Sequence, residues 1–270
     1  MKTTRNTPPV VLIIAANDPS GGAGIVADIE TVSHHQCQPA CVLTALTVQD
    51  SVNVQRIEAV TAELLLAQAE PILADMPVAA IKIGLIGSTA NITALATLLK
   101  KWRDIPVVLD PILRAGGGKP LASQDMAAHM VQELLPLTTL LTPNIHELLS
   151  LAGCSEIPEA VEKLAAAGLE WLLLTTTDET DPLSSEVTNQ LFCQGQAVAS
   201  WRWPRLPHTY HGSGCTLAAA AASAIALAPN APEQILNAAY RAQAFTWQSL
   251  AAGCQLGQGQ WHPNRRFTTP

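Results

Sequence analysis

The chain has 270 residues, of which 48% are hydrophobic and 14% are charged. This size and composition allow one large α/β domain or two small ones, and they exclude extensive disorder. The net charge of −7 argues against a general nucleic-acid binder, which would show a basic face, but it allows one nucleotide in a locally positive pocket.

The N-terminal residues and the cysteines indicate the cytoplasm. The start, MKTTRNTPP, is polar and lacks the apolar region of a signal peptide, and the longest apolar stretch, residues 217–228, is too short to span a bilayer. The six cysteines are scattered without CxxC pairs, which is typical of reduced thiols. We therefore expect a cytoplasmic protein that binds neither membranes nor nucleic acid.

From residue 10 onward, apolar runs of strand length alternate with segments of helical periodicity. The expected strands are residues 10–16, 41–48, 78–84, 106–109, 139–142 and 171–175. The expected helices are residues 24–36, 62–75, 89–102, 122–135 and 157–167. This alternation predicts an α/β fold with a mostly parallel sheet, helices on both sides, and the loops after each strand along one edge.

After residue 190 the pattern changes. The segment LFCQGQAVASWRW, residues 191–203, predicts a β-hairpin that turns at Gln194 and Gly195. Two helices are expected after it, at residues 214–228 and 232–251. We expect one domain over residues 1–270, with roughly eight loose residues at each end.

The first loop with a chemical signal is NDPSGGAG, residues 17–24, between an expected strand and an expected helix. It matches neither the GxGxxG dinucleotide fingerprint nor the phosphate loop GxxxxGK[ST]. Its glycines indicate that something small approaches the backbone there. A plain strand-to-helix turn is the alternative.

The second is TPNIHE, residues 142–147, where Asn144 and Glu147 share one face of a helix that begins after Pro143. An amide oxygen and a carboxylate suit a hydrated magnesium ion. Glu147 could equally be a first-turn acid that complements the helix dipole. Asp110, which ends the strand VVLD, is a second acid expected at the same edge.

The third is HGSGCT, residues 211–216, followed by an alanine-rich helix. Two glycines remove side-chain bulk, and the helix that follows leaves its first N–H groups unpaired. These features predict an anion site at a helix N-terminus. A turn capped by Ser213 or Thr216 is the alternative.

The order DPSGGAGIVADIET, ALTVQDS, KIGLIG, VVLDPIL, TPNIHEL and HGSGCT resembles the hydroxymethylpyrimidine/phosphomethylpyrimidine kinases of thiamin biosynthesis, in the ribokinase-like superfamily. The resemblance runs from about residue 10 to about residue 259. It implies a three-layer α/β/α fold with the hairpin at the sheet edge, ATP and Mg²⁺ as cofactors, and a homodimer. It also implies phosphorylation of 4-amino-5-hydroxymethyl-2-methylpyrimidine, of its monophosphate, or of both.

The resemblance also implies roles for individual residues. Gly212, Ser213, Gly214 and Cys215 form the catalytic anion hole, and Cys215 takes the position of an aspartate base that many relatives carry. A thiolate there requires a lowered pKa, which a helix N-terminus favours. The implied substrate-binding residues are Gln49, Asn17, Asp28 and Gly24. The implied nucleotide and phosphate ligands are Asp110, Asn144 and Thr175, and the implied metal ligands are Glu147, Asn144 and Asp110.

One departure from the family stands out. Where relatives usually have lysine-glycine-glycine-histidine, this chain has TTTD, residues 175–178. The hydroxyl of Thr175 therefore stands at the position of the lysine ammonium. Arg114 and Lys119 are candidates to replace the charge; alternatively, one of two successive phosphorylations is lost or slowed. A smaller departure is Ala16-Asn17 where relatives usually have Gly-Ser. Two other functions stay open: a pyridoxal-type kinase, and a catalytically weak homologue that binds pyrimidine or nucleotide.

Overall fold

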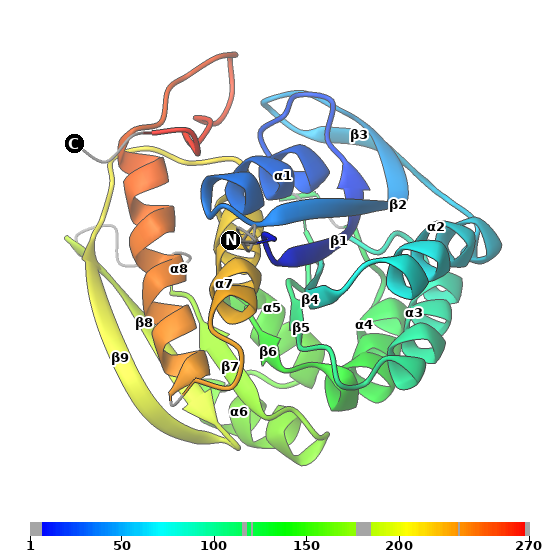
Figure 1. Ribbon diagram of the computed structural model, residues 1–270. Coiled ribbons are helices and arrows are strands. Elements are labelled where there is room, and N and C mark those ends of the chain that lie inside the picture. The colour runs from blue at the N-terminus through cyan, green and yellow to red at the C-terminus, as the bar shows by residue number, and fades with distance from the viewer. Residues whose placement is uncertain (1–6, 115–117, 120, 177–184, 232, 268–270) are drawn as a thin grey trace, which may run out of the picture.

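A computed structural model describes residues 7–114, 118–119, 121–176, 185–231 and 233–267. In these residues one nine-stranded sheet has the order β3-β2-β1-β4-β5-β6-β7-β8-β9 (Figure 1). The strands are β1 (Val10–Asn17), β2 (Gln38–Gln49), β3 (Val54–Ala59), β4 (Val78–Ile83), β5 (Val107–Leu109), β6 (Leu140–Leu141), β7 (Trp171–Leu174), β8 (Glu186–Cys193) and β9 (Gln196–Pro204).

The six strands from β2 to β7 in this order pair in parallel, whereas β3, β8 and β9 pair antiparallel to their neighbours. The predicted α/β class with a mostly parallel sheet is therefore confirmed. The hairpin at the edge is confirmed too, because Cys193 pairs with Gln196 across the turn. Gln194 and Gly195 have φ values of 48° and 79°, which suit a two-residue hairpin turn.

Helices cover both faces of the sheet (Figure 1). One layer contains α1, α7 and α8, and the other contains α2 to α6. The helices are α1 (Gly24–His34), α2 (Ala62–Asp75), α3 (Thr89–Lys101), α4 (Gln124–His129), α5 (Ile145–Ala152), α6 (Ile157–Ala166), α7 (Ser213–Leu227) and α8 (Gln234–Ala251). None of the described helices is long and apolar enough to cross a membrane.

The uninterrupted apolar run of β1 follows from this layering. Val10, Leu12 and Ile14 pack into the core on one face of the sheet, and Val11, Ile13 and Ala15 pack into the core on the other. Successive side chains of a strand point to opposite faces, so a strand covered on both sides is apolar at every position.

Two segments differ from the sequence prediction. The edge strand β3 was not predicted, because VQRIEA has polar residues at both faces and little apolar character. The helix expected over residues 122–135 is shorter: α4 gives way to a π-helical turn, η1 (Met130–Leu134), and a 3₁₀ turn, η2 (Leu135–Leu137). Pro136 lies in the last turn, where it cannot donate an α-helical hydrogen bond.

The C-terminal segment, residues 254–267, folds back on the molecule. Cys254 forms a bridge with His262, and Tyr210 forms one with Trp261. Arg265 is only 1% exposed, so this part of the C-terminal segment packs against the rest of the molecule. The reason is that Arg265 finds buried hydrogen-bond acceptors, which the sequence did not indicate.

Candidate active site

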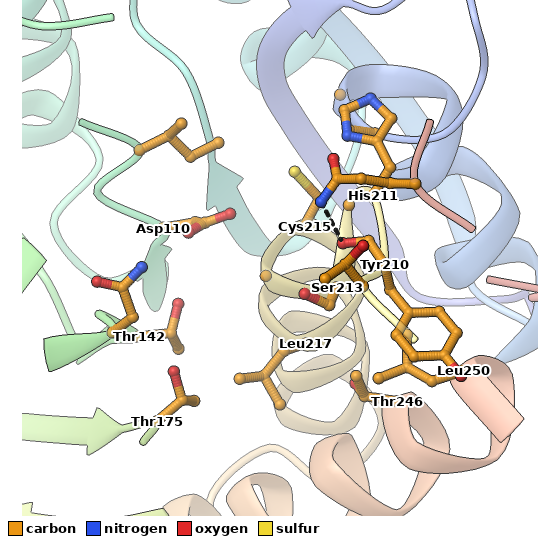
Figure 2. A pocket seen from close by; sticks show the side chains of 18 of the residues that line it. Asp110, Thr142, Thr175, Tyr210, His211, Ser213, Cys215, Leu217, Thr246 and Leu250 are labelled. Carbon is orange, nitrogen blue, oxygen red and sulfur yellow. Dashed lines mark hydrogen bonds between the residues drawn. The ribbon is translucent and has the colours of Figure 1, made fainter. Parts of the chain in front are cut away.

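A cavity of about 520 Å³ opens at the carboxyl ends of the parallel strands, the usual ligand position in open α/β sheets. The residues predicted from the sequence to form a site line it, with one exception. The lining includes Asn17, Gly24, Gln49, Asp110, Asn144, Glu147, Thr175, Gly212, Ser213, Gly214 and Cys215. Figure 2 shows Asp110 and Thr175 on one side of the pocket, facing the N-terminus of α7 with Ser213 and Cys215.

The N-terminus of α7 is built on a left-handed glycine. Gly212 is the N-cap residue, with φ 78°, and a Cβ atom there would collide with the carbonyl oxygen of Gly22 and the Cα of Ala23. The alternative of a turn capped by Ser213 or Thr216 does not hold, because the Thr216 hydroxyl donates backwards to the Gly212 carbonyl at 2.8 Å. The first amides of α7 are thus left to a ligand.

Two pocket residues that the sequence analysis did not assign, Asp18 and His211, join the first loop to this N-terminus. The Asp18 carboxylate accepts hydrogen bonds from the backbone N–H groups of Ser20 and Ala23, both at 2.8 Å. Its Oδ2 also lies 2.8 Å from Nε2 of His211. Burial raises the pKa of Asp18, but hydrogen bonds from His211 and Ser20 outweigh it and the net pKa is lowered. The signal was present, since each residue directly flanks a glycine motif.

The exception is Asp28, which the resemblance placed at the substrate. Its side chain is 0% exposed, and it is not among the described residues that line the pocket. It accepts a hydrogen bond from Nζ of Lys82 at 2.7 Å, and Lys82 itself lines the pocket. Asp28 therefore belongs to an ion pair below the pocket floor, because a buried ammonium requires a counter-charge.

The expectation of a lowered pKa at Cys215 is wrong. Burial raises the pKa of this thiol to about 12, with Asp110 and Asp28 adding to the rise and Lys82 opposing it. Two nearby carboxylates and the loss of water thus outweigh the helix N-terminus. Cys215 is a thiol at neutral pH.

Asp110 lies beside this thiol. Burial raises its pKa to about 6; Lys82 and a hydrogen bond from Cys215 oppose the rise, and Asp28 adds to it. Its Oδ2 is buried and has no hydrogen-bond partner in the part of the chain that the structure describes. A buried carboxylate oxygen without a partner indicates a place for a ligand, since such oxygens are otherwise satisfied.

Asn144 and Glu147 form a capping box at the start of α5. The Asn144 side chain accepts from the Glu147 N–H at 2.8 Å, and Oε2 of Glu147 accepts from the Asn144 N–H at 3.0 Å. Both residues also line the pocket, so Glu147 is at once the first-turn acid of α5 and a pocket residue.

The pocket fits a divalent cation that keeps most of its ligands as water and phosphate. Its donors are oxygens from Asp110, Asn144 and Glu147, which suit magnesium. Within the described ranges there is no group of three or more His, Cys, Asp or Glu side chains that could hold a metal by themselves.

Thr175 lines the pocket, and its backbone N–H donates to the Pro143 carbonyl at 3.0 Å. Of the two candidate cations, Arg114 lines the pocket, whereas Lys119 donates to the Gln55 carbonyl at 2.7 Å. Residues 177 and 178 of the TTTD segment lie outside the described residues.

The sequence analysis missed the apolar wall of the pocket, formed by Trp203, Leu206, Trp247 and Leu250. These residues come from the end of β9, the loop after it, and α8. No motif marks them, because an apolar pocket residue and an apolar core residue give the same sequence pattern.

The comparisons with known proteins agree with the geometry. The family model described as phosphomethylpyrimidine kinase matches residues 18–264. A hydroxymethylpyrimidine/phosphomethylpyrimidine kinase of Synechococcus elongatus is 32% identical over 262 residues, covering 93% of this chain and 95% of the relative. One of Mycobacterium tuberculosis is 33% identical over 264 residues, covering 94% and 92%.

Solved structures show the same fold. The ADP complex of Bacillus subtilis pyridoxal kinase has a TM-score of 0.85 at 26% identity and covers 96% of this chain and 97% of that one. A phosphomethylpyrimidine kinase from Clostridium difficile has a TM-score of 0.71 at 27% identity and covers 87% and 99%. The match over nearly the whole length, together with a pocket that unites the sequence motifs, shows that this chain belongs to the phosphomethylpyrimidine kinase family.

Proposed function

We propose that this chain transfers a phosphoryl group from ATP to 4-amino-5-hydroxymethyl-2-methylpyrimidine, to its monophosphate, or to both, in thiamin biosynthesis. The observation that carries the proposal is the single pocket that brings the strand-end loops to the N-terminus of α7. The family membership of the chain supplies the substrate class.

In this proposal, each group of pocket residues has its own role in the reaction. The first amides of α7 hold the transferring phosphate, because they carry partial positive charge. Gln49, at the end of β2, lines the pocket and hydrogen-bonds the aminopyrimidine in this proposal, since a side-chain amide both donates and accepts. Cys215, as a neutral thiol, serves as hydrogen-bond partner to the attacking oxygen.

Asp110, Asn144 and Glu147 would hold magnesium, which neutralises charge on the nucleotide phosphates when it is bound. Thr175 is placed beside those phosphates, where relatives usually have a lysine. Positioning and charge neutralisation supply most of the catalysis in phosphoryl transfer, and a pocket of loops, amides and carboxylates can provide both.

Steady-state ATP consumption with the pyrimidine, its monophosphate and pyridoxal in parallel tests the proposal. We expect the pyrimidine or its monophosphate to give the largest kcat/KM. Gln49→Ala should raise the KM for pyrimidine about tenfold or more while leaving the KM for ATP within about twofold. Equal losses for both substrates would mean that Gln49 has only a structural role.

A pyridoxal-type kinase is the second candidate. One observation favours it: the Bacillus subtilis pyridoxal kinase superposes with a TM-score of 0.85, against 0.71 for the Clostridium difficile phosphomethylpyrimidine kinase. A preference for pyridoxal in the same assay would select it. Binding of pyrimidine or nucleotide without turnover would instead identify a catalytically weak homologue.

Two further properties are proposed, the oligomeric state from the family resemblance and the location from the scattered cysteines. We propose a homodimer located in the cytoplasm. Light scattering of the purified protein measures the oligomeric state, and a monomer at micromolar concentration would exclude the dimer.

A further inference from the structure

Two pocket loops meet where the phosphate would bind: the first loop, residues 17–24, and the anion loop, residues 211–216. We propose that Arg265, from the C-terminal segment, is a positioning residue that holds these two loops in register for phosphoryl transfer. The inference rests on the proposed function. Arg265 is not among the described residues that line the pocket, so it acts through the loops and not on the ligand.

The guanidinium of Arg265 contacts both loops. Its Nη2 donates to the carbonyl of Gly22 in the first loop at 2.5 Å. Its Nε donates to the hydroxyl of Thr216 at 2.8 Å. The same hydroxyl donates to the carbonyl of Gly212 at 2.8 Å, so a chain of hydrogen bonds runs from one loop to the N-cap of α7.

The third contact anchors the guanidinium from outside the pocket. Nη1 of Arg265 lies 3.5 Å from Oε2 of Glu30, on α1. Figure 1 shows the C-terminal segment passing from the end of α8 toward α1. The planar guanidinium of an arginine can donate hydrogen bonds to three partners in different directions at once. A lysine ammonium at the same place cannot do this equally well.

The loops have no free space between them in which to shift independently. A Cβ on Gly22 would collide with His211, and a Cβ on Gly212 would collide with Gly22 and with Arg265 itself. On the pocket side, the contact of Asp18 with His211 ties the same loops together. Because Arg265 occupies part of this junction, its loss would open space on the side away from the pocket, and the anion loop and the first amides of α7 could then shift relative to the first loop.

Arg265 is 1% exposed, and a buried charge is retained only where its contacts compensate for the loss of water. Arg266 provides the matched control. Its Nε lies 3.4 Å from Glu30, the same partner, but its side chain is 82% exposed. The two arginines thus share an acid and differ in whether they reach the loops.

The test compares Arg265→Gln, Arg265→Lys and Arg266→Gln with the wild type, using kcat, KM and the free energy of unfolding. Arg265→Gln should lower kcat about 10- to 100-fold per folded molecule, because a displacement near one ångström costs about that much. The KM for pyrimidine should stay within about twofold. Arg265→Lys should restore part of kcat, and Arg266→Gln should match the wild type.

A purely structural role predicts a different result: lower stability and a smaller folded fraction, with an unchanged kcat for the molecules that are folded. That result would overturn the proposal, as would an equal loss of kcat in Arg266→Gln. If Arg265→Gln does not fold, Thr216→Val removes the middle of the hydrogen-bond chain alone and should lower kcat in the same direction.

Amide hydrogen exchange separates this inference from the proposed function. Exchange at residues 216–219, the first amides of α7 that donate to helix carbonyls, should rise in Arg265→Gln and Thr216→Val but not in Arg266→Gln. If the wild type phosphorylates none of the substrates, the proposed function fails, while the exchange data still decide whether Arg265 orders the N-terminus of α7. Unchanged exchange at these amides would contradict the inference.

Discussion

Cys215 shows how strongly the tertiary environment changes a side chain's chemistry. A cysteine at a helix N-terminus is a candidate thiolate by its sequence position. In the structure it is buried at the pocket wall beside Asp110, and burial raises its pKa to about 12. Burial and neighbours from distant segments cannot be inferred from HGSGCT, and this is why the sequence prediction of the pKa was wrong.

Cys215→Ala should impair phosphorylation of the hydroxymethyl substrate more than that of its monophosphate. The hydroxyl nucleophile gains from a hydrogen-bond partner, whereas the phosphorylated substrate is already an ionised nucleophile. We expect kcat for the first reaction to fall about 10- to 100-fold. Cys215→Ser, whose hydroxyl can still accept a hydrogen bond from the attacking hydroxyl, is the control; equal losses on both substrates in Cys215→Ala would remove this distinction.

Thr175→Lys tests the missing cation. A lysine here would stand beside the proposed nucleotide phosphates. The monophosphate substrate carries a negative charge that the hydroxymethyl substrate lacks, and the lysine ammonium would neutralise part of it. We expect a selective gain in kcat on the monophosphate of roughly tenfold, since one fixed charge in a dry site is worth several kcal/mol at most. Thr175→Met controls for side-chain size. A gain on both substrates alike, or in Thr175→Met as well, would argue against charge as the cause.

Helix and strand positions were predictable where local patterns decide them. The sequence prediction of α2 over residues 62–75 matches its bounds, and α6 differs from its prediction by one residue. The two failures have different causes: β3 is held by its tertiary pairing with β2, whereas the helix expected over residues 122–135 gives way to η1 and η2 around Pro136, which is a local restraint.

The site could be predicted in part, where its residues stand in local sequence motifs. Glycine motifs and strand-end acids mark Asp110, Asn144 and the anion loop. Arg265 carried no such signal, because its partners come from segments remote in sequence. The apolar pocket wall could not be told from the core.

The capping box of α5 allows the two roles of Asn144 to be separated. Asn144→Ala removes the cap and should lower the free energy of unfolding by about 1 kcal/mol. Asn144→Ser keeps a good N-cap but withdraws the amide from the pocket, so its stability should stay near wild type while activity falls. Urea unfolding and kcat measured on both variants check this. If Asn144→Ser retains full activity, Asn144 is a cap alone.

At the scale of the whole molecule, the sheet gathers the site from remote segments. The parallel strands β2, β1, β4, β5, β6 and β7 end at one edge, where residues from Asn17 to Cys215 come to share a pocket. Directly below that pocket, the ion pair of Lys82 and Asp28 joins β4 to α1 in the core.

Lys82→Met should lower the free energy of unfolding by about 3–5 kcal/mol, because it leaves the Asp28 carboxylate buried without its counter-charge. The double variant Lys82→Met/Asp28→Leu removes both charges and should recover most of that loss. Urea denaturation followed by circular dichroism measures both. A double variant no more stable than Lys82→Met would show that the pair is not held by charge compensation.

Under the proposed function, this pocket transfers the γ-phosphoryl group of ATP to the pyrimidine. Mass spectrometry of a reaction with γ-¹⁸O-labelled ATP measures this directly. We predict labelled pyrimidine monophosphate, diphosphate or both in the wild type, and little product from Gly212→Ala, in which a Cβ collides with the first loop. Labelled inorganic phosphate without any labelled pyrimidine, or undiminished product from Gly212→Ala, would contradict the account.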